Sequence, residues 1–171
     1  MNFKRSAALL AVALTCGAAQ VQSAPPPAAA AAVPPLPVLV ALKAAEAALA
    51  ACVSQGLTPT VTVSDREGVP RVVLVADGAG PVSISTSRRK AYSASSLGIT
   101  TAQLAKNAAA MHIVPQSVDP ELLPLPGGFP IISHNVVIAG IGVGGADRGT
   151  ESSDEACAQA GIAAIKAELD R

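Results

Sequence analysis

Aromatic side chains are almost absent from this sequence. Of its 171 residues, only Phe3, Tyr92 and Phe129 carry a phenyl or phenol ring, and there is no tryptophan. A chain so poor in rings lacks the stacking platforms that bind single-stranded nucleic acids and the aromatic cages that hold quaternary ammonium ligands. An excess of basic charge is also missing, since 12 lysines and arginines face 12 aspartates and glutamates. We therefore expect no nucleic-acid partner.

No apolar run reaches the roughly 20 residues that a membrane-spanning helix needs. The run at residues 7–16 follows two basic residues and precedes three small ones. A basic start, a short apolar run and a small-residue end are the pattern of a secretory signal peptide. Residues 1–24 are therefore predicted to be a signal, cleaved after Ala19 or after Ala24, and the proline that follows Ala24 disfavours the second position.

The mature protein is then expected to be secreted or periplasmic, with no membrane span. A lipid anchor on Cys16 is the alternative. It is disfavoured because Thr15 stands where a lipoprotein signal carries glycine or alanine.

Cysteine is scarce, and only Cys52 and Cys157 remain once the signal is removed. An oxidising compartment permits a disulfide between them, which would stabilise the fold by restricting the unfolded chain. The alternative is that both are small buried apolar residues on helices. The spacing gives no distance between the two thiols, so both interpretations stay open.

Proline and alanine dominate residues 25–37, which we interpret as an extended tether. Residues 38–171 are predicted to form a single domain, because helical and strand periodicities alternate along them. The expected elements are a helix over 38–55, strands over 60–65 and 69–76, helices over 82–97 and 101–111, strands over 130–133 and 136–143, and a last helix from Ser152 or Ser153 onward.

This order predicts an α+β fold: an antiparallel sheet of four to five strands, built from two hairpins and flanked by helices. The inner helix faces are assigned from residues that recur at steps of three and four. They are Leu39, Leu42, Ala45, Leu49 and Cys52 on the first helix and Ile84, Ser87, Ala91 and Ala94 on the second.

Three glycines, Gly140, Gly142 and Gly145, match the letters of a dinucleotide-binding fingerprint. That site needs a helix directly after the glycines, and then a second parallel strand with an acidic residue about 20 residues further on. Only 26 residues follow Gly145, and a loop and one helix take them up. We expect no nucleotide cofactor, and we interpret the glycines as positions that a neighbouring backbone, a helix or a ligand approaches closely.

A basic cluster on the second helix contains Arg89 and Lys90, with Tyr92 beside it. Such a cluster usually forms a solvated face, and the alternative is that it holds an anionic group such as a propionate at the rim of a cleft. Gly127, Gly128 and Phe129 follow an apolar, proline-rich segment. They are candidates for the lining of a pocket, and the alternative is a rigid connector packed on the core.

Two histidines are present, and no spacing of His, Cys, Asp or Glu matches a zinc site. His112 is a candidate ligand of haem iron, with Met111 or Tyr92 as alternatives, or else it contacts the last carbonyls of a helix. His134 is expected in solvent at a hairpin tip. No Gly-x-Ser-x-Gly motif occurs, and no catalytic residue is assigned.

Six short motifs occur in a fixed order along the domain. They are V-T-V-S-D-R-E-G (61–68), D-G-A-G (77–80), R-K-A-Y-S-A (89–94), L-P-G-G-F-P-I (125–131), G-I-G-V-G-G (140–145) and D-E-A-C-A-Q-A-G-I (154–162). Together they resemble the GlcG/HbpS family of haem-binding or haem-degrading proteins. The resemblance implies a profilin-like α+β fold, assembly into homo-oligomers and, for secreted members, haem as ligand. It carries over no ligand residue, and Ser133-His134-Asn135 departs from the acidic, glycine-containing turn common in the family.

The signal peptide and the resemblance favour a secreted protein that binds a small molecule, with haem as the first candidate. One alternative is an enzyme that degrades haem or acts on a small carbonyl or hydroxy-acid metabolite. The sequence shows no convergent acid, base or nucleophile for it, so binding is favoured over catalysis. Another alternative is a structural module that serves only oligomerisation.

Overall fold

The computed structural model describes residues 34–146 and 152–171 of the chain. The predicted signal peptide and residues 25–33 of the predicted tether lie outside these ranges. Leu36, at the end of the predicted tether, is only 6% exposed and belongs to the apolar core, so this end of the segment packs against the domain. No helix within the described ranges is both long enough and apolar enough to cross a bilayer.

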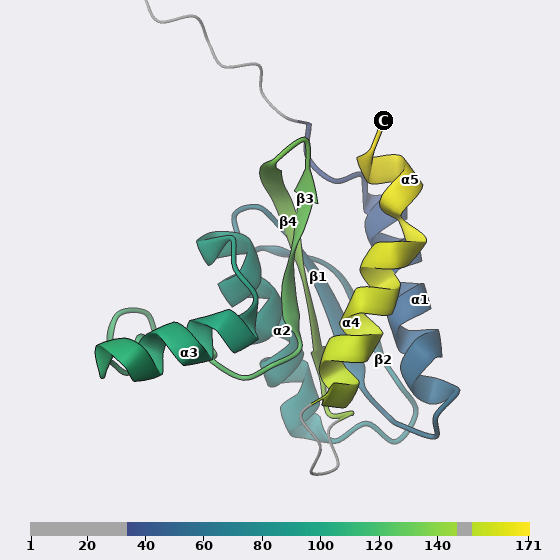
Figure 1. The fold of residues 1–171 in the computed structure, drawn as a ribbon. Coiled ribbons are helices and arrows are strands. Elements are labelled where there is room, and N and C mark those ends of the chain that lie inside the picture. The colour runs from purple at the N-terminus through teal and green to yellow at the C-terminus, as the bar shows by residue number, and fades with distance from the viewer. Residues whose placement is uncertain (1–33, 147–151) are drawn as a thin grey trace, which may run out of the picture. The chain divides into compact units, whose positions relative to one another are not determined.

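A four-stranded antiparallel sheet lies at the centre of the domain (Figure 1). Its strands are β1 (Thr60–Asp65), β2 (Pro70–Val75), β3 (Gly128–Ser133) and β4 (Val136–Gly144), in the order β2-β1-β4-β3. The hairpins β1–β2 and β3–β4 therefore join through β1 and β4. This confirms the predicted α+β fold with a sheet built from two hairpins.

Both hairpins turn at residues with a left-handed backbone. In the first, Gly68 has φ 82°, and the Asp65 carboxylate accepts a hydrogen bond of 2.9 Å from the Val69 N–H. In the second, His134 (φ 49°) and Asn135 (φ 63°) form a two-residue turn. Two successive positive φ values are typical of a type I′ turn, whose twist matches that of antiparallel strands.

Helices cover both faces of the sheet (Figure 1). On one face lie α1 (Val38–Val53) and α4 (Ser152–Ala164), which continues into the short α5 (Lys166–Leu169). On the other lies α2 (Pro81–Leu97). The next helix, α3 (Thr101–Met111), extends to the side, and the 3-10 turn η1 (Pro115–Ser117) follows it.

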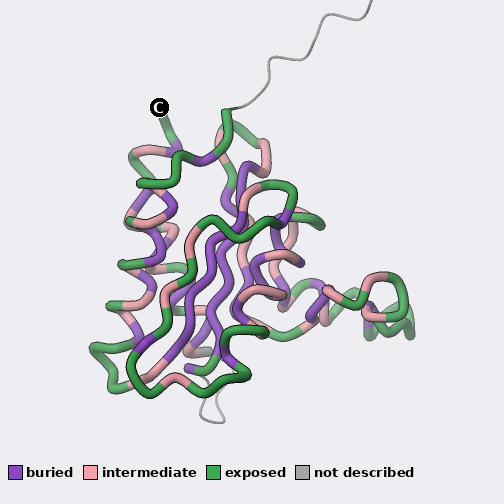
Figure 2. The backbone as a smooth tube through the Cα atoms, turned by 180° about the vertical axis from the view of Figure 1, so that it is seen from behind, coloured by how far each residue is buried: buried purple, intermediate pink, exposed green. Residues whose placement is uncertain are grey.

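The apolar core fills the space between the sheet and the α1–α4 pair. Val61 and Val63 of β1 and Ile141 and Val143 of β4 are fully buried there, and the buried strands stand out in Figure 2. On α1, the buried stripe consists of Ala41, Ala44, Ala45, Ala48 and Cys52.

The predicted inner stripe of α1 is wrong at Leu39, which is 75% exposed. The reason is how closely α1 and α4 pack. A Cβ on Gly161 of α4 would stand 2.6 Å from the Ala44 carbonyl oxygen, so only small side chains fit between these helices.

The opposite face of the sheet is polar and rich in glycine. Thr60 and Thr62 of β1 share hydrogen bonds of 2.7 and 2.9 Å with Ser83 and Ser87 of α2. On β4, a Cβ at Gly142 would overlap the Ser87 carbonyl oxygen. The glycine motif therefore lets the α2 backbone lie directly on the sheet. Because this contact is made by serines, the predicted inner residue Ile84 faces away and is 47% exposed.

A disulfide joins the two helices on the apolar side. The Sγ atoms of Cys52 on α1 and Cys157 on α4 are bonded, and both residues are fully buried. The bridge crosses the core between segments that are 105 residues apart in the sequence.

Candidate functional site

Of the predicted ligand residues on α2, Arg89 contacts the loop that precedes β3. Arg89 donates hydrogen bonds of 2.7 and 3.0 Å to the carbonyl oxygens of Pro120 and Leu122, and a longer one of 3.4 Å to that of Glu121. Its neighbour Arg88 forms an ion pair with the Glu121 carboxylate. Arg89 therefore fastens the loop before β3 onto α2.

Tyr92 holds the same loop. Its hydroxyl donates a hydrogen bond of 2.6 Å to the Asp119 carboxylate. This bond raises the pKa of the Tyr92 phenol and lowers the pKa of the Asp119 carboxyl, because the carboxylate accepts the phenol proton as a hydrogen bond. The contact joins Tyr92 to a loop residue.

Lys90 is buried, which corrects the expectation of a solvated basic face. Its Nζ lies 2.6 Å from Asp154 Oδ2 and donates a second hydrogen bond of 2.9 Å to the Val143 carbonyl oxygen. The side chains of Lys90 and Asp154 are 5% and 2% exposed, and Asp154 Oδ1 accepts from the Ala146 N–H. The ion pair joins α2 to α4 across the end of β4. Both side chains line a cavity of about 400 Å³.

Gly127, Gly128 and Phe129 contact packed neighbours. A Cβ on Gly127 would stand 2.6 Å from the Asp154 Cβ, and one on Gly128 would stand 2.6 Å from the Lys90 carbonyl oxygen. Phe129 lies on β3 and packs against the apolar core. None of the three lines a described cavity, so the arrangement matches the rigid connector considered as the alternative.

His112 ends α3 with φ 54° and is exposed to solvent. The preceding Met111 lines an apolar cavity of about 300 Å³ beneath α3, which we call the arm cavity. Its walls come from the end of α2, from α3 and from the segment around η1. They are Leu97, Ile99, Leu104, Asn107, Ala108, Met111, Ile113, Pro115, Val118 and Leu122.

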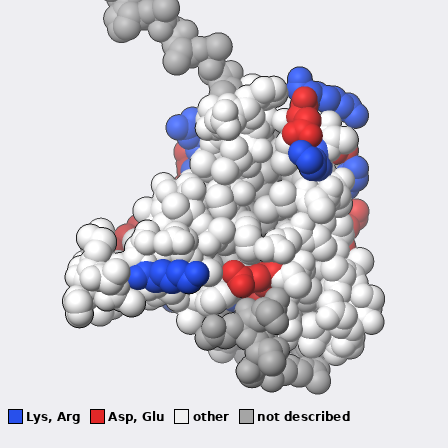
Figure 3. Space-filling view, in the orientation of Figure 1, with Lys and Arg blue, Asp and Glu red and all other residues white. Residues whose placement is uncertain are grey.

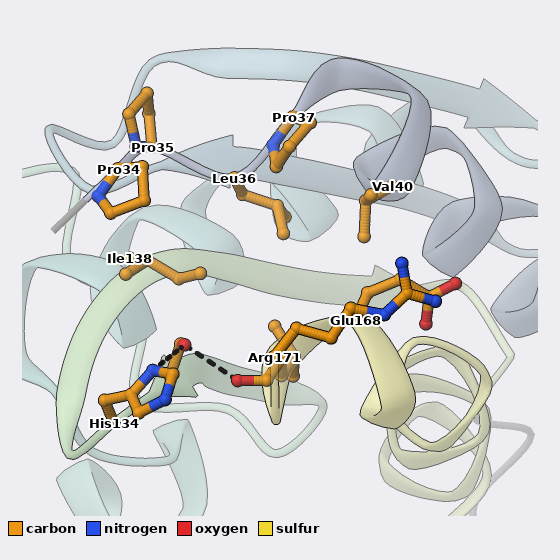
Figure 4. Close-up of a pocket in the computed structure, with 11 residues that line it drawn as sticks. Pro34, Pro35, Leu36, Pro37, Val40, His134, Ile138, Glu168 and Arg171 are labelled. Carbon is orange, nitrogen blue, oxygen red and sulfur yellow. Dashed lines mark hydrogen bonds between the residues drawn. The ribbon is translucent and has the colours of Figure 1, made fainter.

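A larger cavity, of about 520 Å³, lies where residues 34–37 meet the β3–β4 hairpin and the end of α5 (Figure 4). We call it the terminal cavity. Prolines and aliphatic residues form its walls, and polar side chains stand at its rim. The lining residues are Pro34, Pro35, Leu36, Pro37, Val40, Ser133, His134, Ile138, Glu168, Leu169 and Arg171.

The rim of the terminal cavity is organised by hydrogen bonds. The Ser133 hydroxyl donates to the Leu169 carbonyl oxygen at 2.8 Å and lies 3.0 Å from His134 Nδ1, as the dashed lines in Figure 4 mark. The Glu168 carboxylate accepts a hydrogen bond of 2.7 Å from Lys43 of α1, which lowers the pKa of that carboxyl. Charged side chains gather over α5 at this end of the domain, whereas much of the same face is uncharged (Figure 3).

Sequence reasoning missed the partner of Lys90 and the surroundings of His134. Nothing local to Lys90 pointed to Asp154, which lies 64 residues further along. For His134, the available signal was a two-residue turn, His134-Asn135, in place of the usual Asn-Gly or Asp-Gly pair. Among the described residues, no three His, Cys, Asp or Glu side chains come together as a metal-binding group. A haem iron needs only one ligand from the protein, so this finding does not bear on haem.

A comparison with family models and one with solved structures identify relatives of this chain. The family model described as "Haem degrading protein HbpS-like" matches residues 36–163. A structure of a double mutant of Streptomyces reticuli HbpS is 35% identical, with a TM-score of 0.73, and the match covers 86% of this chain and 98% of that one.

Two further structures share the fold. Klebsiella pneumoniae ORFY, of family DUF336, is 26% identical with a TM-score of 0.70, over 77% of this chain and 91% of that one. A PduOC:haem complex is 21% identical with a TM-score of 0.69, over 77% and 95% of the two chains. No curated protein matched the chain.

Proposed function

The chain belongs to the HbpS-like family of haem-degrading proteins, and on this basis we propose that it binds haem at the terminal cavity. One observation carries the choice of site. The terminal cavity combines apolar walls with an imidazole and a guanidinium at its rim. The haem in the related PduOC complex supports the choice of ligand.

The walls suit the edge of a porphyrin. Small-molecule pockets enclose roughly 300–1,000 Å³ and are lined mostly by apolar groups, with a few polar ones that fix orientation. The terminal cavity, at about 520 Å³, falls within that range. Leu36, Val40 and Ile138 offer aliphatic surface, and the prolines at 34, 35 and 37 offer rigid apolar rings.

The rim suits the polar parts of haem. The guanidinium of Arg171 can pair with a propionate through two parallel hydrogen bonds. Glu168 stands at the same rim and also attracts Arg171, but its carboxylate accepts a hydrogen bond from Lys43, which compensates part of its negative charge. Haem would supply an iron that accepts an axial ligand from the protein, and His134 is the imidazole at this rim.

The arm cavity is the second candidate site. Met111 lines it, and His112, the predicted iron ligand, directly follows. Its volume is smaller, at about 300 Å³, and no cationic side chain is among its lining residues to pair with a propionate.

A haem titration with two matched variants tests both the function and the site. Val40→Trp fills the terminal cavity, and Ile113→Trp fills the arm cavity from another β-branched position. We expect a saturable Soret shift at low-micromolar haem for the natural protein, an unchanged shift for Ile113→Trp and a weakened one for Val40→Trp. The reverse pattern would move the site to the arm cavity, and no shift from folded protein would refute haem binding.

Degradation of haem is the alternative activity that the family's description suggests. Incubating the haem-loaded protein with a reductant and oxygen separates the two activities. A stable Soret band supports binding alone, and a progressive loss of the band supports degradation.

Secretion and assembly complete the proposal. The buried Cys52–Cys157 disulfide supports export, since such bridges persist in oxidising compartments. Homo-oligomerisation through α3 and the following segment is supported by Met111, Val114 and Val118, which are 66%, 64% and 76% exposed. The mass of the exported chain and light scattering of the purified protein test these two points.

A further inference from the structure

We propose that Nε2 of His134 is the protein ligand of the haem iron, and that Ser133 fixes the imidazole in the tautomer that ligation requires. The inference rests on the proposed haem binding, and it names the protein atom that would bind the iron. From the sequence, His134 is expected only as a solvated turn residue.

The hydrogen bonds at the rim determine which nitrogen of His134 carries the proton. A serine hydroxyl has one proton to donate. The Leu169 carbonyl oxygen, 2.8 Å from Ser133 Oγ, can only accept, so the hydroxyl proton points toward it. With its proton engaged in this way, the Oγ atom offers its lone pairs to His134 Nδ1 at 3.0 Å, and this pairing needs the tautomer in which Nδ1 carries the proton. In the neutral imidazole, Nε2 therefore keeps its lone pair.

This arrangement is the one that metal-bound histidines use. A ligating imidazole donates its other N–H to a carbonyl, carboxylate or water, which fixes the tautomer and orients the ring. Here the Leu169 carbonyl acts through the Ser133 hydroxyl. The chain of hydrogen bonds ties the hairpin tip to the end of α5, so the imidazole is held by a part of the fold other than its own turn.

The backbone of His134 is left-handed, as a turn of this type requires. Asn-Gly and Asp-Gly are the usual pairs of a type I′ turn, and here His134 and Asn135 take the two places with φ 49° and 63°. His112 has a similar φ of 54°, so this conformation does not by itself separate the two histidines. The contact of the His134 ring with Ser133 does.

The location fits the shape of haem. The apolar walls of the terminal cavity would hold the edge of a haem, and His134 at the rim would supply a ligand to its iron. His134 lies on that rim, exposed, next to the cavity walls (Figure 4).

The test compares the two histidines by the same substitution. His134→Asn removes the imidazole and keeps a residue that tolerates positive φ, and His112→Asn does the same at the other exposed left-handed histidine, with φ 54°. We expect His134→Asn to shift the Soret band and to weaken haem binding by at least about 100-fold, more than loss of an outer partner costs. His112→Asn should keep the natural spectrum and affinity.

Ser133 is tested as a positioning residue, with a readout that needs no haem. Nitrogen NMR of the ligand-free protein should show His134 protonated at Nδ1 in the natural chain and in Ser133→Thr, which keeps the hydroxyl. Ser133→Ala should lose that preference and bind haem about 10- to 100-fold more weakly, and Ser133→Thr should restore both properties. Circular dichroism and thermal melting of every variant confirm that it is folded.

Several outcomes would overturn the inference. If the natural protein binds haem and His134→Asn has the same spectrum and affinity, the ligand is another atom, while haem binding stands. If only His112→Asn loses the spectrum, the ligand is His112. Protonation of His134 at Nε2 in the ligand-free protein would refute the tautomer argument directly. If the natural folded protein binds no haem, the proposed function itself fails.

Discussion

Removing the disulfide should cost this protein a large part of its stability. Cys52 and Cys157 are 105 residues apart, so the bridge closes most of the domain into one loop. In the chain-entropy model, a loop of that length lowers the free energy of the folded state relative to the unfolded state by about 4.7 kcal/mol. Small domains have unfolding free energies of about 5–15 kcal/mol, so the loss would be a substantial fraction of the whole.

Urea denaturation of the natural chain and of the Cys52→Ala/Cys157→Ala variant measures this loss. With a urea slope of about 1–3 kcal/mol per molar, a loss of about 4.7 kcal/mol lowers the midpoint by about 1.6–4.7 M. The variant's slope should also rise, because an unbridged unfolded chain exposes more surface. Denaturing the natural protein with a reductant present is the control that changes no side chain, and it should give a similar midpoint.

The single variants show whether the bridge or the packing is responsible. Both sulfurs are fully buried, so truncation also removes packed atoms. If the bridge dominates, Cys52→Ala alone should cost nearly as much as the double variant, because either substitution opens the loop. Losses that add between the single variants, or a total below about 1 kcal/mol, would refute the loop-closure argument.

Three other contacts give further predictions. Gly142→Ala should destabilise by at least about 1–3 kcal/mol, because the new methyl meets the α2 backbone, and thermal melting would show it. Lys90→Met should cost about 3–5 kcal/mol by removing the ammonium that pairs with the buried Asp154 carboxylate, and Lys90→Met/Asp154→Leu should recover most of that loss in urea denaturation. The Asp119 carboxyl has a lowered pKa in the folded state, so its contribution to stability is present at neutral pH and is lost as the pH falls below about 3.8 through that pKa. Tyr92→Phe, which removes the main cause of the shift, should flatten this part of the pH dependence of the unfolding free energy, and an unchanged profile would contradict the assignment.

The strands could be predicted because their residues alternate between the two faces of the sheet. In β1, threonine alternates with valine, and the structure directs valines to the apolar core and threonines to the serines of α2. The glycines of β4 carried the same kind of information. Their position in a strand without a following nucleotide-binding helix indicated close packing, and α2 lies against them.

The helix faces were harder to predict because alanine hides the pattern. On α1, leucines at steps of three and four suggested the inner stripe, yet alanines occupy the buried positions and Leu39 is exposed. Burial here depends on how closely α4 approaches, and that distance is set by Gly161, more than a hundred residues away. Periodicity within one helix contains no such information.

The candidate site depends even more on contacts between distant segments. Residues 34–37 read as a tether because proline favours an extended chain, yet an extended segment can also form the wall of a cavity once Leu36 is anchored in the core. The sequence predicts that His134 is a solvated turn residue. The structure agrees, because the backbone of His134 forms the turn and its ring is exposed. What gives the imidazole a defined tautomer is the carbonyl of Leu169, brought within reach of Ser133 by the packing of α5 beside the hairpin. A solvated turn residue can therefore also be an iron ligand. His112 ends its helix in a similar left-handed conformation, and what distinguishes His134 from it is the contact with Ser133.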